Sequence, residues 1–461
     1  MSKHSARLIK HLVDLKPSLL DGPIGTSATM ALLDTLGCGL YGSQQQWGRI
    51  LREQILDEGS RGKATLFGEN VTVAPSRAAL ANGTASHGFE LDDIIQGALV
   101  HPGAVVIPAA LAVAEQSGAS GERLLLGIVA GYEVIARLGW ALGAEHNTRG
   151  YHTTGVAGPI AATVAAGIVL GQSVEIILSA IGIACSSAGG IKAFTQGTGG
   201  MVKRMHAGRA AETGVLACEL AQRGFTGPMA GVDGHFGLLE VIGGADTCVE
   251  ALTNSLGGEY AISKVWVKAY PCCGLIHSVS HAIEAIRKES ALTSADVKRI
   301  VVHTSRRAVE HNGDPNPQET MAAQYSIPYC AGAAVVNNPR DPASFNAQGL
   351  HDTEIRRVAA LTQLCIDEKM DALYPAHFAA RVEIILNGER QFERTVIDPH
   401  GTASDACDTA EIEAKFRLLT KPVKAPQRID QVINAVRDLR RVSSIAALSA
   451  ALSNQDAREY T

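Results

Sequence analysis

The sequence predicts a mainly α-helical protein in which a smaller α+β segment is inserted into a large helical domain. Apolar residues recur three and four positions apart through most of residues 1–265, as in ERLLLGIVAGYEVIARLGWALG (122–143). The alternation of apolar and polar residues that is typical of strands begins only from about residue 266. Helical periodicity then returns near the C-terminus, so the last helices are expected to rejoin the first domain. The predicted parts are therefore 1–265, 266–403 and 404–461.

Small residues occupy many positions on the predicted helical faces, which lets neighbouring helices approach closely. The segment GPIAATVAAGIVLG (158–171) is rich in Ala and Gly and is shorter than the roughly 20 apolar residues that a membrane span needs. It is therefore predicted to be a helix buried among other helices, and no membrane partner is expected.

The inserted segment combines strands with helices. VKRIVVHTS and AARVEIILNGERQFERTV (379–396) alternate apolar and polar residues, and Asn387-Gly388 between two such runs is a strong hairpin signal. Helical patterns are expected at 277–290 and from Pro328 onward. These features predict an α+β segment.

Composition excludes several classes of protein. The chain has 461 residues, of which 46% are hydrophobic and 19% are charged, and its formal net charge is −5. These values are typical of a globular enzyme or binding protein and argue against a nucleic-acid partner. The nine cysteines are scattered through apolar runs, and no secretory leader pattern opens the sequence, so a cytoplasmic protein with reduced thiols is expected.

The first chemical motif is SHGFELDDIIQGALVHPGA, residues 86–104. A helix continuing to Asp93 would place His87, Glu90 and Asp93 on neighbouring positions, where the two acids repel each other. One interpretation is a helix end with solvated carboxylates, because acids are usually exposed. The glycines within this charged segment favour the other interpretation, in which it forms a pocket wall.

Two histidines directly precede apolar helical patterns. His101 stands before Pro102, and His152 stands before Thr153 and Thr154, which are candidate helix caps. Free N–H groups at a helix N-terminus suit an anionic ligand. Either histidine alone is more often structural than catalytic, but the pair, together with the basic strip that follows, indicates an anion site.

A basic strip follows in VKRMHAGRAAETG. Lys203, His206 and Arg209 are spaced three apart, so a helix would align them and let them bind carboxylates or phosphates. The alternative is a solvated basic face, although the adjoining alanines indicate close packing. Neither a P-loop nor a dinucleotide-binding fingerprint is present.

The segment VKAYPCCGLIHS adds Lys268, the vicinal pair Cys272 and Cys273, and His277. One histidine beside two adjacent cysteines lacks the paired ligand spacing of a zinc site, so buried structural thiols are the better interpretation. No metal is predicted.

Together these segments resemble the MmgE/PrpD family, in order and approximate separation, over nearly the whole chain. The segments that carry the resemblance are LLDTLGCGLYG, ANGTASHGFELDD, HPGAVVIPAALAVAE, GYHTTGVAG, VKRMHAGRAAETG, KAYPCC and QYSIPYCAGAA. The resemblance implies a homodimer, an α+β lid, and a cofactor-independent site for small di- or tricarboxylates between the domains. Members include 2-methylcitrate dehydratase, cis-aconitate decarboxylase and iminodisuccinate epimerase.

The resemblance also implies roles for individual residues. His101, His152, Lys203, Lys268 and Tyr329 fall on the family's active-site positions. We expect a catalytic set and a substrate-binding set. The catalytic set is His101, His152, Tyr329 and Lys203. The substrate-binding set is Lys268, Glu90, Asp93, His206 and Cys273.

These expectations rank four functions. A hydro-lyase resembling 2-methylcitrate dehydratase comes first, an epimerase or isomerase of a substrate such as iminodisuccinate second, and a decarboxylase of the cis-aconitate type third. The decarboxylase ranks third because Glu90, Ile94 and Cys273 stand where that enzyme has aspartate, threonine and histidine. A non-catalytic carboxylate-binding homodimer is the alternative from another class.

Overall fold

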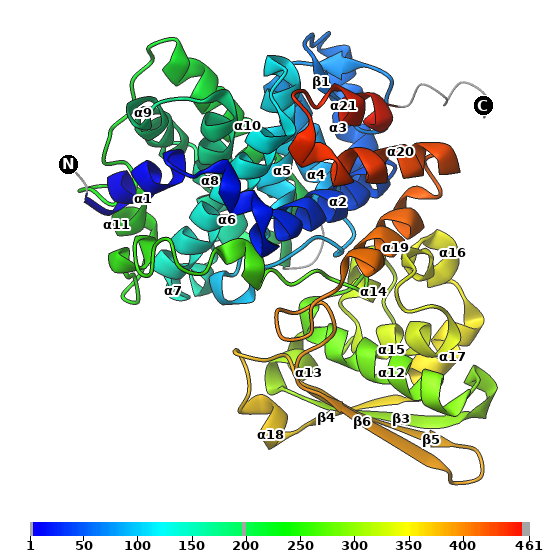
Figure 1. Cartoon of the computed structure of the whole chain (residues 1–461). Coiled ribbons are helices and arrows are strands. Elements are labelled where there is room, and N and C mark those ends of the chain that lie inside the picture. The colour runs from blue at the N-terminus through cyan, green and yellow to red at the C-terminus, as the bar shows by residue number, and fades with distance from the viewer. Residues whose placement is uncertain (1–2, 196–199, 454–461) are drawn as a thin grey trace. The chain divides into compact units, whose positions relative to one another are not determined.

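The computed structural model describes residues 3–195 and 200–453, which form two compact units (Figure 1). The helical unit comprises Met1–Gly88, Asp92–Val265 and Thr409–Thr461, and the mixed unit comprises Phe89–Leu91 and Trp266–Asp408. The fold class is confirmed, because the structure is mainly helical with a small mixed sheet in its C-terminal region. One feature was not expected: the three residues Phe89–Leu91 belong to the mixed unit.

The helical unit contains most of the helices and one two-stranded ladder. Its helices are α1 (Lys3–Val13), α2 (Pro23–Ser43), α3 (Gln46–Asp57), α4 (Pro75–Ser86), α5 (Gly103–Ser117), α6 (Gly121–Leu142), α7 (Glu145–Thr148), α8 (Thr153–Leu170), α9 (Val174–Cys185), α10 (Met201–Gln222), α11 (Leu238–Ile242), α19 (Thr409–Thr420), α20 (Pro426–Arg437) and α21 (Ala446–Leu452). Strands β1 (Ala64–Thr65) and β2 (Thr72–Val73) pair antiparallel.

Helix α8 forms the centre of this unit, as its uniformly apolar sequence predicts. It packs against α5, α6, α9 and α10, and every residue from Thr153 to Val169 is buried. Helix α10 approaches α8 closely at Gly214, where a Cβ would lie 2.4 Å from the Ala162 Cβ atom. It approaches α4 equally closely at Gly208, where a Cβ would lie 2.2 Å from the Leu80 carbonyl oxygen. These glycines set the position of α10, and therefore of Lys203 and His206, against α4 and α8.

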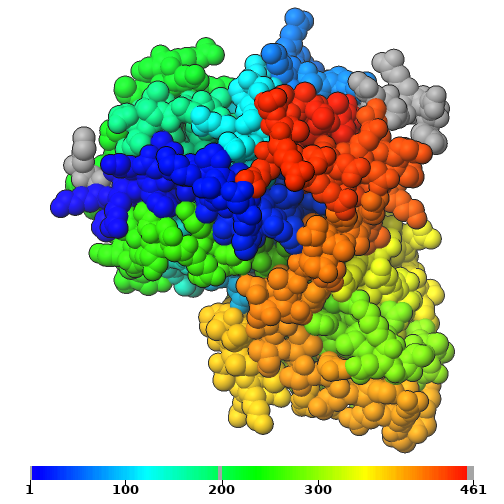
Figure 2. Space-filling model, in the orientation of Figure 1, coloured from blue at the N-terminus to red at the C-terminus, as the bar shows by residue number. Residues whose placement is uncertain are grey.

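Helices from the N-terminal and C-terminal parts of the described chain pack together in the helical unit. Helix α2 packs against α19 and α20, so the N-terminal helices (blue) and the C-terminal helices (red and orange) share one face in the space-filling view (Figure 2). An ion pair joins them, with Lys415 Nζ 2.7 Å from Oδ1 of the buried Asp34.

The mixed unit is built on a four-stranded sheet in the order β4-β3-β5-β6. Strand β3 (Val297–Thr304) pairs parallel with β4 (Thr362–Ile366) and antiparallel with β5 (Ala380–Leu386), and β5 pairs antiparallel with β6 (Gln391–Val396). The predicted hairpin is confirmed: Leu386 N–H donates to the Arg390 carbonyl at 2.8 Å, and Gly388 has a φ of +92°. Strand β4 was not foreseen, because its five residues do not alternate regularly between buried and exposed.

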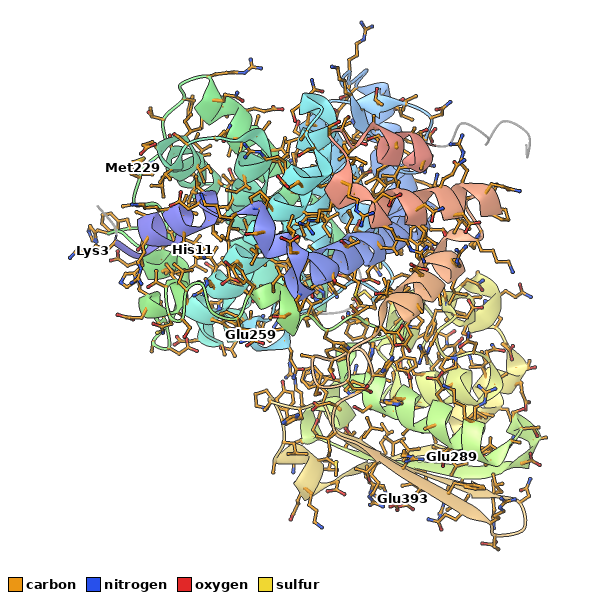
Figure 3. All side chains as sticks on the ribbon, in the orientation of Figure 1. Lys3, His11, Met229, Glu259, Glu289 and Glu393 are labelled. Carbon is orange, nitrogen blue, oxygen red and sulfur yellow. The ribbon has the colours of Figure 1, made fainter. Side chains whose placement is uncertain are left out.

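Helices cover one face of this sheet, with α12 packing against β5 and β6 and α15 against β4 (Figure 1). The two predicted helices are confirmed as α12 (His277–Ser290) and α15 (Ile327–Val336). Glu289 of α12 and Glu393 of β6 are exposed polar positions of this unit, as Figure 3 shows. The remaining helices are α13 (Arg306–Asn312), α14 (Thr320–Gln324), α16 (Ala347–Leu350), α17 (Thr353–Ala360) and α18 (Glu368–Asp371).

Two described helices, α6 and α8, are long and apolar enough to cross a membrane by length and composition. In each, 94% of the apolar window is buried inside the structure, as in the core helices of globular domains.

Candidate active site

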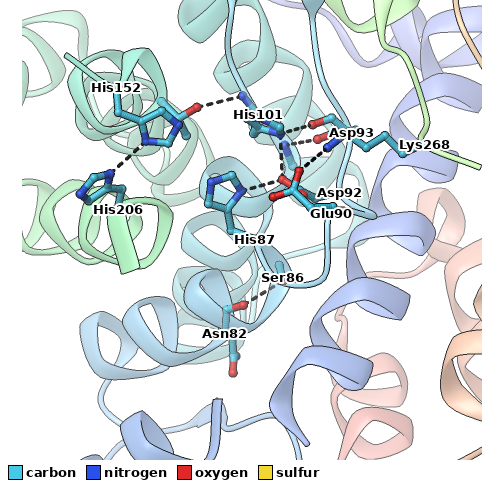
Figure 4. A network of polar contacts seen from close by, with 12 residues as sticks. Asn82, Ser86, His87, Glu90, Asp92, Asp93, His101, His152, His206 and Lys268 are labelled. Atoms are coloured by element: carbon cyan, nitrogen blue, oxygen red, sulfur yellow. Dashed lines mark hydrogen bonds and ion pairs between the residues drawn. The ribbon is translucent and has the colours of Figure 1, made fainter. Parts of the chain in front are cut away.

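In the helical unit, two buried histidines contact the same carboxylate oxygen of a buried aspartate (Figure 4). Asp92 Oδ2 lies 2.7 Å from His87 Nδ1 and 3.0 Å from His101 Nδ1. His87 and Asp92 are 1% and 3% exposed. A carboxylate buried this deeply is stable only when it accepts good hydrogen bonds, and here two imidazoles supply them.

The local chain path explains how these residues meet. Helix α4 ends at Ser86 and does not continue to Asp93, so the expectation of a longer helix is wrong. Phe89 and Glu90 have φ values of 66° and 55°, in the left-handed region that ends a helix. The chain therefore turns back after His87 and brings Asp92 against it.

The hydrogen bonds of His101 determine its tautomer. Its Nδ1 atom lies 3.0 Å from both Asp92 Oδ2 and the Asp93 carbonyl oxygen. Both are acceptors, so Nδ1 carries the hydrogen when the ring is neutral, and Nε2 keeps a lone pair for proton transfer. The backbone N–H of His101 donates to Thr154 Oγ1 at 3.1 Å, which ties it to the first turn of α8.

Electrostatics separate the roles of Asp92 and His87. Burial alone raises the pKa of Asp92, but attraction to His87 and His101 and hydrogen bonds from both rings hold it well below its usual value. Burial lowers the pKa of His87 to about 4 despite the neighbouring Asp92. At neutral pH the cluster therefore contains a carboxylate and a neutral His87 ring. Among the described residues, the buried Nε2 atom of His87 has no hydrogen-bond partner.

Asp93 holds the start of α5 in place. Its Oδ1 accepts the Gly103 N–H at 2.8 Å, and its Oδ2 accepts the Tyr132 hydroxyl at 2.6 Å. Burial raises the pKa of Asp93 to about 7 despite these two hydrogen bonds. The residue is 2% exposed and both of its carboxylate oxygens accept hydrogen bonds within the helical unit, which weighs against a substrate contact, and the predicted binding role stays a prediction.

His152 forms a second cluster with His206 of α10. His152 is the residue before α8, and its Nδ1 lies 3.0 Å from His206 Nδ1. The His87 ring connects the two clusters, because its centroid lies 4.8 Å from that of His101 and 5.8 Å from that of His152. The structure thus brings together four histidines of the helical unit.

Lys203 supplies positive charge to this group of rings. It is 6% exposed and lies one helical turn before His206. Burial lowers the pKa values of His152 and His206, and the charge of Lys203 lowers them further. Arg209, the third member of the predicted strip, is exposed and pairs with Glu212, so the strip divides into a buried half and a solvated half.

Another group of predicted residues lies in the mixed unit. Lys268 Nζ is 3.3 Å from Glu90 Oε2, with the two side chains 2% and 5% exposed. Gln324 Nε2 donates to the Phe89 carbonyl at 2.8 Å, which explains why this short segment belongs to the unit. Burial raises the pKa of Cys273 to about 11, with a contribution from Glu90, so its side chain is a neutral thiol at neutral pH.

With this geometry known, similarity to characterised proteins is informative. Residues 6–250 match the MmgE/PrpD N-terminal domain, and residues 270–439 match the MmgE/PrpD C-terminal domain. The chain belongs to the MmgE/PrpD family.

Several MmgE/PrpD relatives are similar over almost their whole length. A cis-aconitate decarboxylase-like protein, oryM, of Aspergillus oryzae is 29% identical over 98% of this chain and 97% of the relative. A cis-aconitate decarboxylase of Aspergillus terreus is 26% identical over 91% of this chain and 90% of the relative. The cis-aconitate decarboxylase of Homo sapiens is 26% identical over 94% of this chain and 91% of the relative.

The catalytic role predicted for Tyr329 from the MmgE/PrpD resemblance stays a prediction, and its contacts weigh against it. Tyr329 is 0% exposed, and its hydroxyl lies 2.7 Å from the Ser344 carbonyl and 2.8 Å from the Gly349 carbonyl. Burial raises its pKa above the usual value for a phenol. The hydroxyl proton is therefore engaged in backbone hydrogen bonds of the mixed unit.

Two residues of this cluster, His87 and Asp92, are absent from the site sets predicted from the sequence and the MmgE/PrpD resemblance. The sequence shows His87 only as a helix neighbour of Glu90. It predicts that Glu90, Asp92 and Asp93 orient or neutralise neighbouring bases, without deciding which of the three points inward. The sequence does carry a signal for this contact. A histidine and two adjacent aspartates lie in a short, glycine-containing connection between two apolar helical patterns. Polar side chains buried there need hydrogen-bond partners, and the nearest candidates are one another.

The cluster of His87, Asp92 and His101 has the residue composition of a metal site. His87, Asp92 and His101 each offer one ligand atom, and these atoms lie within 4.8 Å of one another. Two imidazoles and a carboxylate suit several divalent ions. Each imidazole Nδ1–H has a carboxylate acceptor here, so an ion would have to displace both protons. The expectation of a site without metal or cofactor stays a prediction.

Proposed function

We propose that this protein is a lyase for a small di- or tricarboxylate, with decarboxylation of a cis-aconitate-type acid as the favoured reaction. The observation that carries the proposal is His101, whose Nδ1–H is held by the buried Asp92 carboxylate while Nε2 keeps its lone pair. The named relatives support decarboxylation over dehydration, which reverses the order expected from the sequence.

The proposed chemistry requires a group that moves a proton at carbon. When an unsaturated tricarboxylic acid loses CO₂, the C–C electron pair forms a new double bond and the original double bond shifts. A proton must then be delivered to the carbon next to a remaining carboxylate. His101 is suited to this step because Asp92 stabilises the imidazolium form, which donates the proton from Nε2.

Positive charge must hold the remaining carboxylates and the charge that develops in the transition state. Lys203 and the first turns of α5 and α8, which follow His101 and His152, are the groups of the helical unit suited to this task. That Lys268 and Cys273 of the mixed unit act together with them stays a prediction. The same holds for the homodimer and the cytoplasmic location.

A hydro-lyase reaction on a 2-methylcitrate-like acid is the second candidate. Glu90, Ile94 and Cys273 depart from the decarboxylase pattern, and Glu90 forms a buried pair with Lys268. In this reaction His101 Nε2 would take the proton next to a carboxylate while a hydroxyl leaves the neighbouring carbon. Both reactions use the same oriented histidine in opposite proton-transfer directions.

The test is product identification by NMR in D₂O. The protein is incubated separately with cis-aconitate, 2-methylcitrate and iminodisuccinate. Release of CO₂ from cis-aconitate, with one deuterium in the product, supports the proposal. Water loss from 2-methylcitrate alone supports the second candidate. Deuterium exchange without net change of skeleton indicates an epimerase, and no change with any acid indicates the binding protein.

Variants connect activity to the site. His101→Asn should lower kcat/KM by roughly 10²–10⁴-fold, because it removes the proton-transfer group. His235→Asn is the matched control, since His235 is an exposed histidine of the same unit paired with Glu240. Wild-type activity in His101→Asn would contradict the assignment of His101.

A further inference from the structure

Two imidazole side chains of the helical unit form a hydrogen bond directly with each other. His152 Nδ1 and His206 Nδ1 lie 3.0 Å apart, and Figure 4 draws this contact. A neutral imidazole has one N–H and one lone pair, so one ring donates and the other accepts. The tautomer of each ring therefore determines the tautomer of the other.

The surroundings hold both rings in this arrangement. Phe194 meets them edge-on, with centroids 5.6 Å from His152 and 5.8 Å from His206. The Gly190 carbonyl accepts the His152 N–H at 2.9 Å. A Cβ at Gly190, which has a φ of +133°, would lie 3.2 Å from His206 Nδ1. Gly190 therefore fixes His152 by a hydrogen bond and leaves room for His206 beside it.

Charge favours a neutral pair. Burial lowers the pKa of His152 well below its usual value, with further contributions from His87 and Lys203. Burial and Lys203 lower the pKa of His206 as well. Two neutral rings form an N–H···N hydrogen bond, whereas two imidazolium rings would repel each other at this distance.

The two rings differ in their access to solvent. His152 is 7% exposed, whereas His206 is half-buried. His152 lies beside His87 of the Asp92 cluster, at a centroid distance of 5.8 Å. His206 is thus the outer ring and His152 the inner ring.

We propose that His206 is the outer member of a two-histidine relay that carries a proton between solvent and His152, and that it does not bind substrate. In the delivering direction, His206 Nε2 takes a proton from water, its Nδ1–H proton moves to His152 Nδ1, and the His152 Nε2–H proton moves into the site, where it replaces the proton that His101 has delivered to carbon. One proton enters and one leaves, and both rings end in the other tautomer. This inference rests on the proposed function, and in it His206 acts on the reaction only through His152, by passing it a proton.

The test compares three variants with the acid that the wild-type protein converts. His206→Ala should lower kcat by about 10²-fold and leave KM nearly unchanged, because proton supply slows while substrate binding is kept. Added imidazole should restore the rate of this variant, since a free imidazole can carry protons where the side chain is missing. His206→Gln keeps a side-chain amide toward His152 but carries no proton, so it should remain slow. His235→Ala is the matched control and should show neither effect.

Each outcome decides the inference. A His206→Ala variant that is folded by circular dichroism and keeps the wild-type kcat overturns the relay while the proposed function stands. Full activity in His206→Gln overturns it too, because positioning alone would then suffice. Wild-type protein that converts none of the acids overturns the proposed function and the relay together. Independently, ¹⁵N-histidine NMR should show a coupling between the two Nδ1 nuclei that is lost in His206→Gln, and its absence from the wild type contradicts the hydrogen bond.

Discussion

Replacing Asp92 by Asn removes the charge that two imidazoles share while keeping the size of the side chain. Asp92 accepts hydrogen bonds at 2.7 Å from His87 and at 3.0 Å from His101, in a site where it is 3% exposed. A hydrogen bond to a charged group contributes about 1.5–3 kcal/mol. Only the His101 bond bears on proton transfer, so kcat/KM should fall roughly 10- to 150-fold, at about 1.4 kcal/mol per factor of ten.

The assay is kcat/KM of Asp92→Asn with the acid identified for the wild type, beside a thermal unfolding curve that reports stability separately. Asp93→Asn is the matched control, since Asp93 contacts Gly103 and Tyr132 with its carboxylate and His101 only through its backbone carbonyl. Asp92→Asn should lower kcat/KM at least tenfold more than the control does. Equal loss in the two variants would refute the reasoning that the Asp92 carboxylate orients His101.

Three further predictions concern stability. The pKa of Asp93 is raised from 3.8 to about 7 by burial, so its contribution is fully present below pH 4 and is lost as pH rises to 7. The free energy of unfolding of Asp93→Asn, measured by urea titration, should therefore rise relative to that of the wild type by up to about 4 kcal/mol between pH 4 and pH 7. A difference in unfolding free energy that does not change with pH would contradict this. Gly214→Ala should lower the unfolding free energy by about 1–3 kcal/mol, because its Cβ would lie 2.4 Å from Ala162 Cβ. Gly22→Ala, with nothing within 4 Å, is the control, and equal melting temperatures would refute the close approach. Glu90→Gln should destabilise the protein by about 3 kcal/mol, and Lys268→Met added to it should recover part of the loss in the same melts; no recovery would contradict the pairing.

Local patterns predicted much of the fold. Periodicity identified α6, α8, α12 and α15, and Asn387-Gly388 identified the turn between β5 and β6. These features depend on residues within about one helical turn or one hairpin of each other, so the sequence carries them directly. The histidines before α5 and α8 were found in the same way, because helix starts have local signals.

The end of α4 and the acid that faces the histidines were not predictable in this way. A continued helix after Ser86 has acceptable local propensity, but it would leave Asp92 away from His87 and His101. Asp92 and Asp93 are adjacent and chemically identical, yet one accepts from two imidazoles and the other from Gly103 and Tyr132. Tyr132 lies in the middle of an apolar helix, where nothing in the local pattern indicates a partner.

The sequence by itself determined the fold class, the order of its main elements and the set of residues from which a carboxylate site can be built. Tertiary structure decided which of those residues meet, which carboxylate remains charged and which nitrogen of His101 carries its hydrogen. The physical reason is the distance along the chain over which each effect acts. Propensity and periodicity act between near neighbours in the chain. Burial and hydrogen bonding act between groups such as His152 and His206 that come together only when the helices pack.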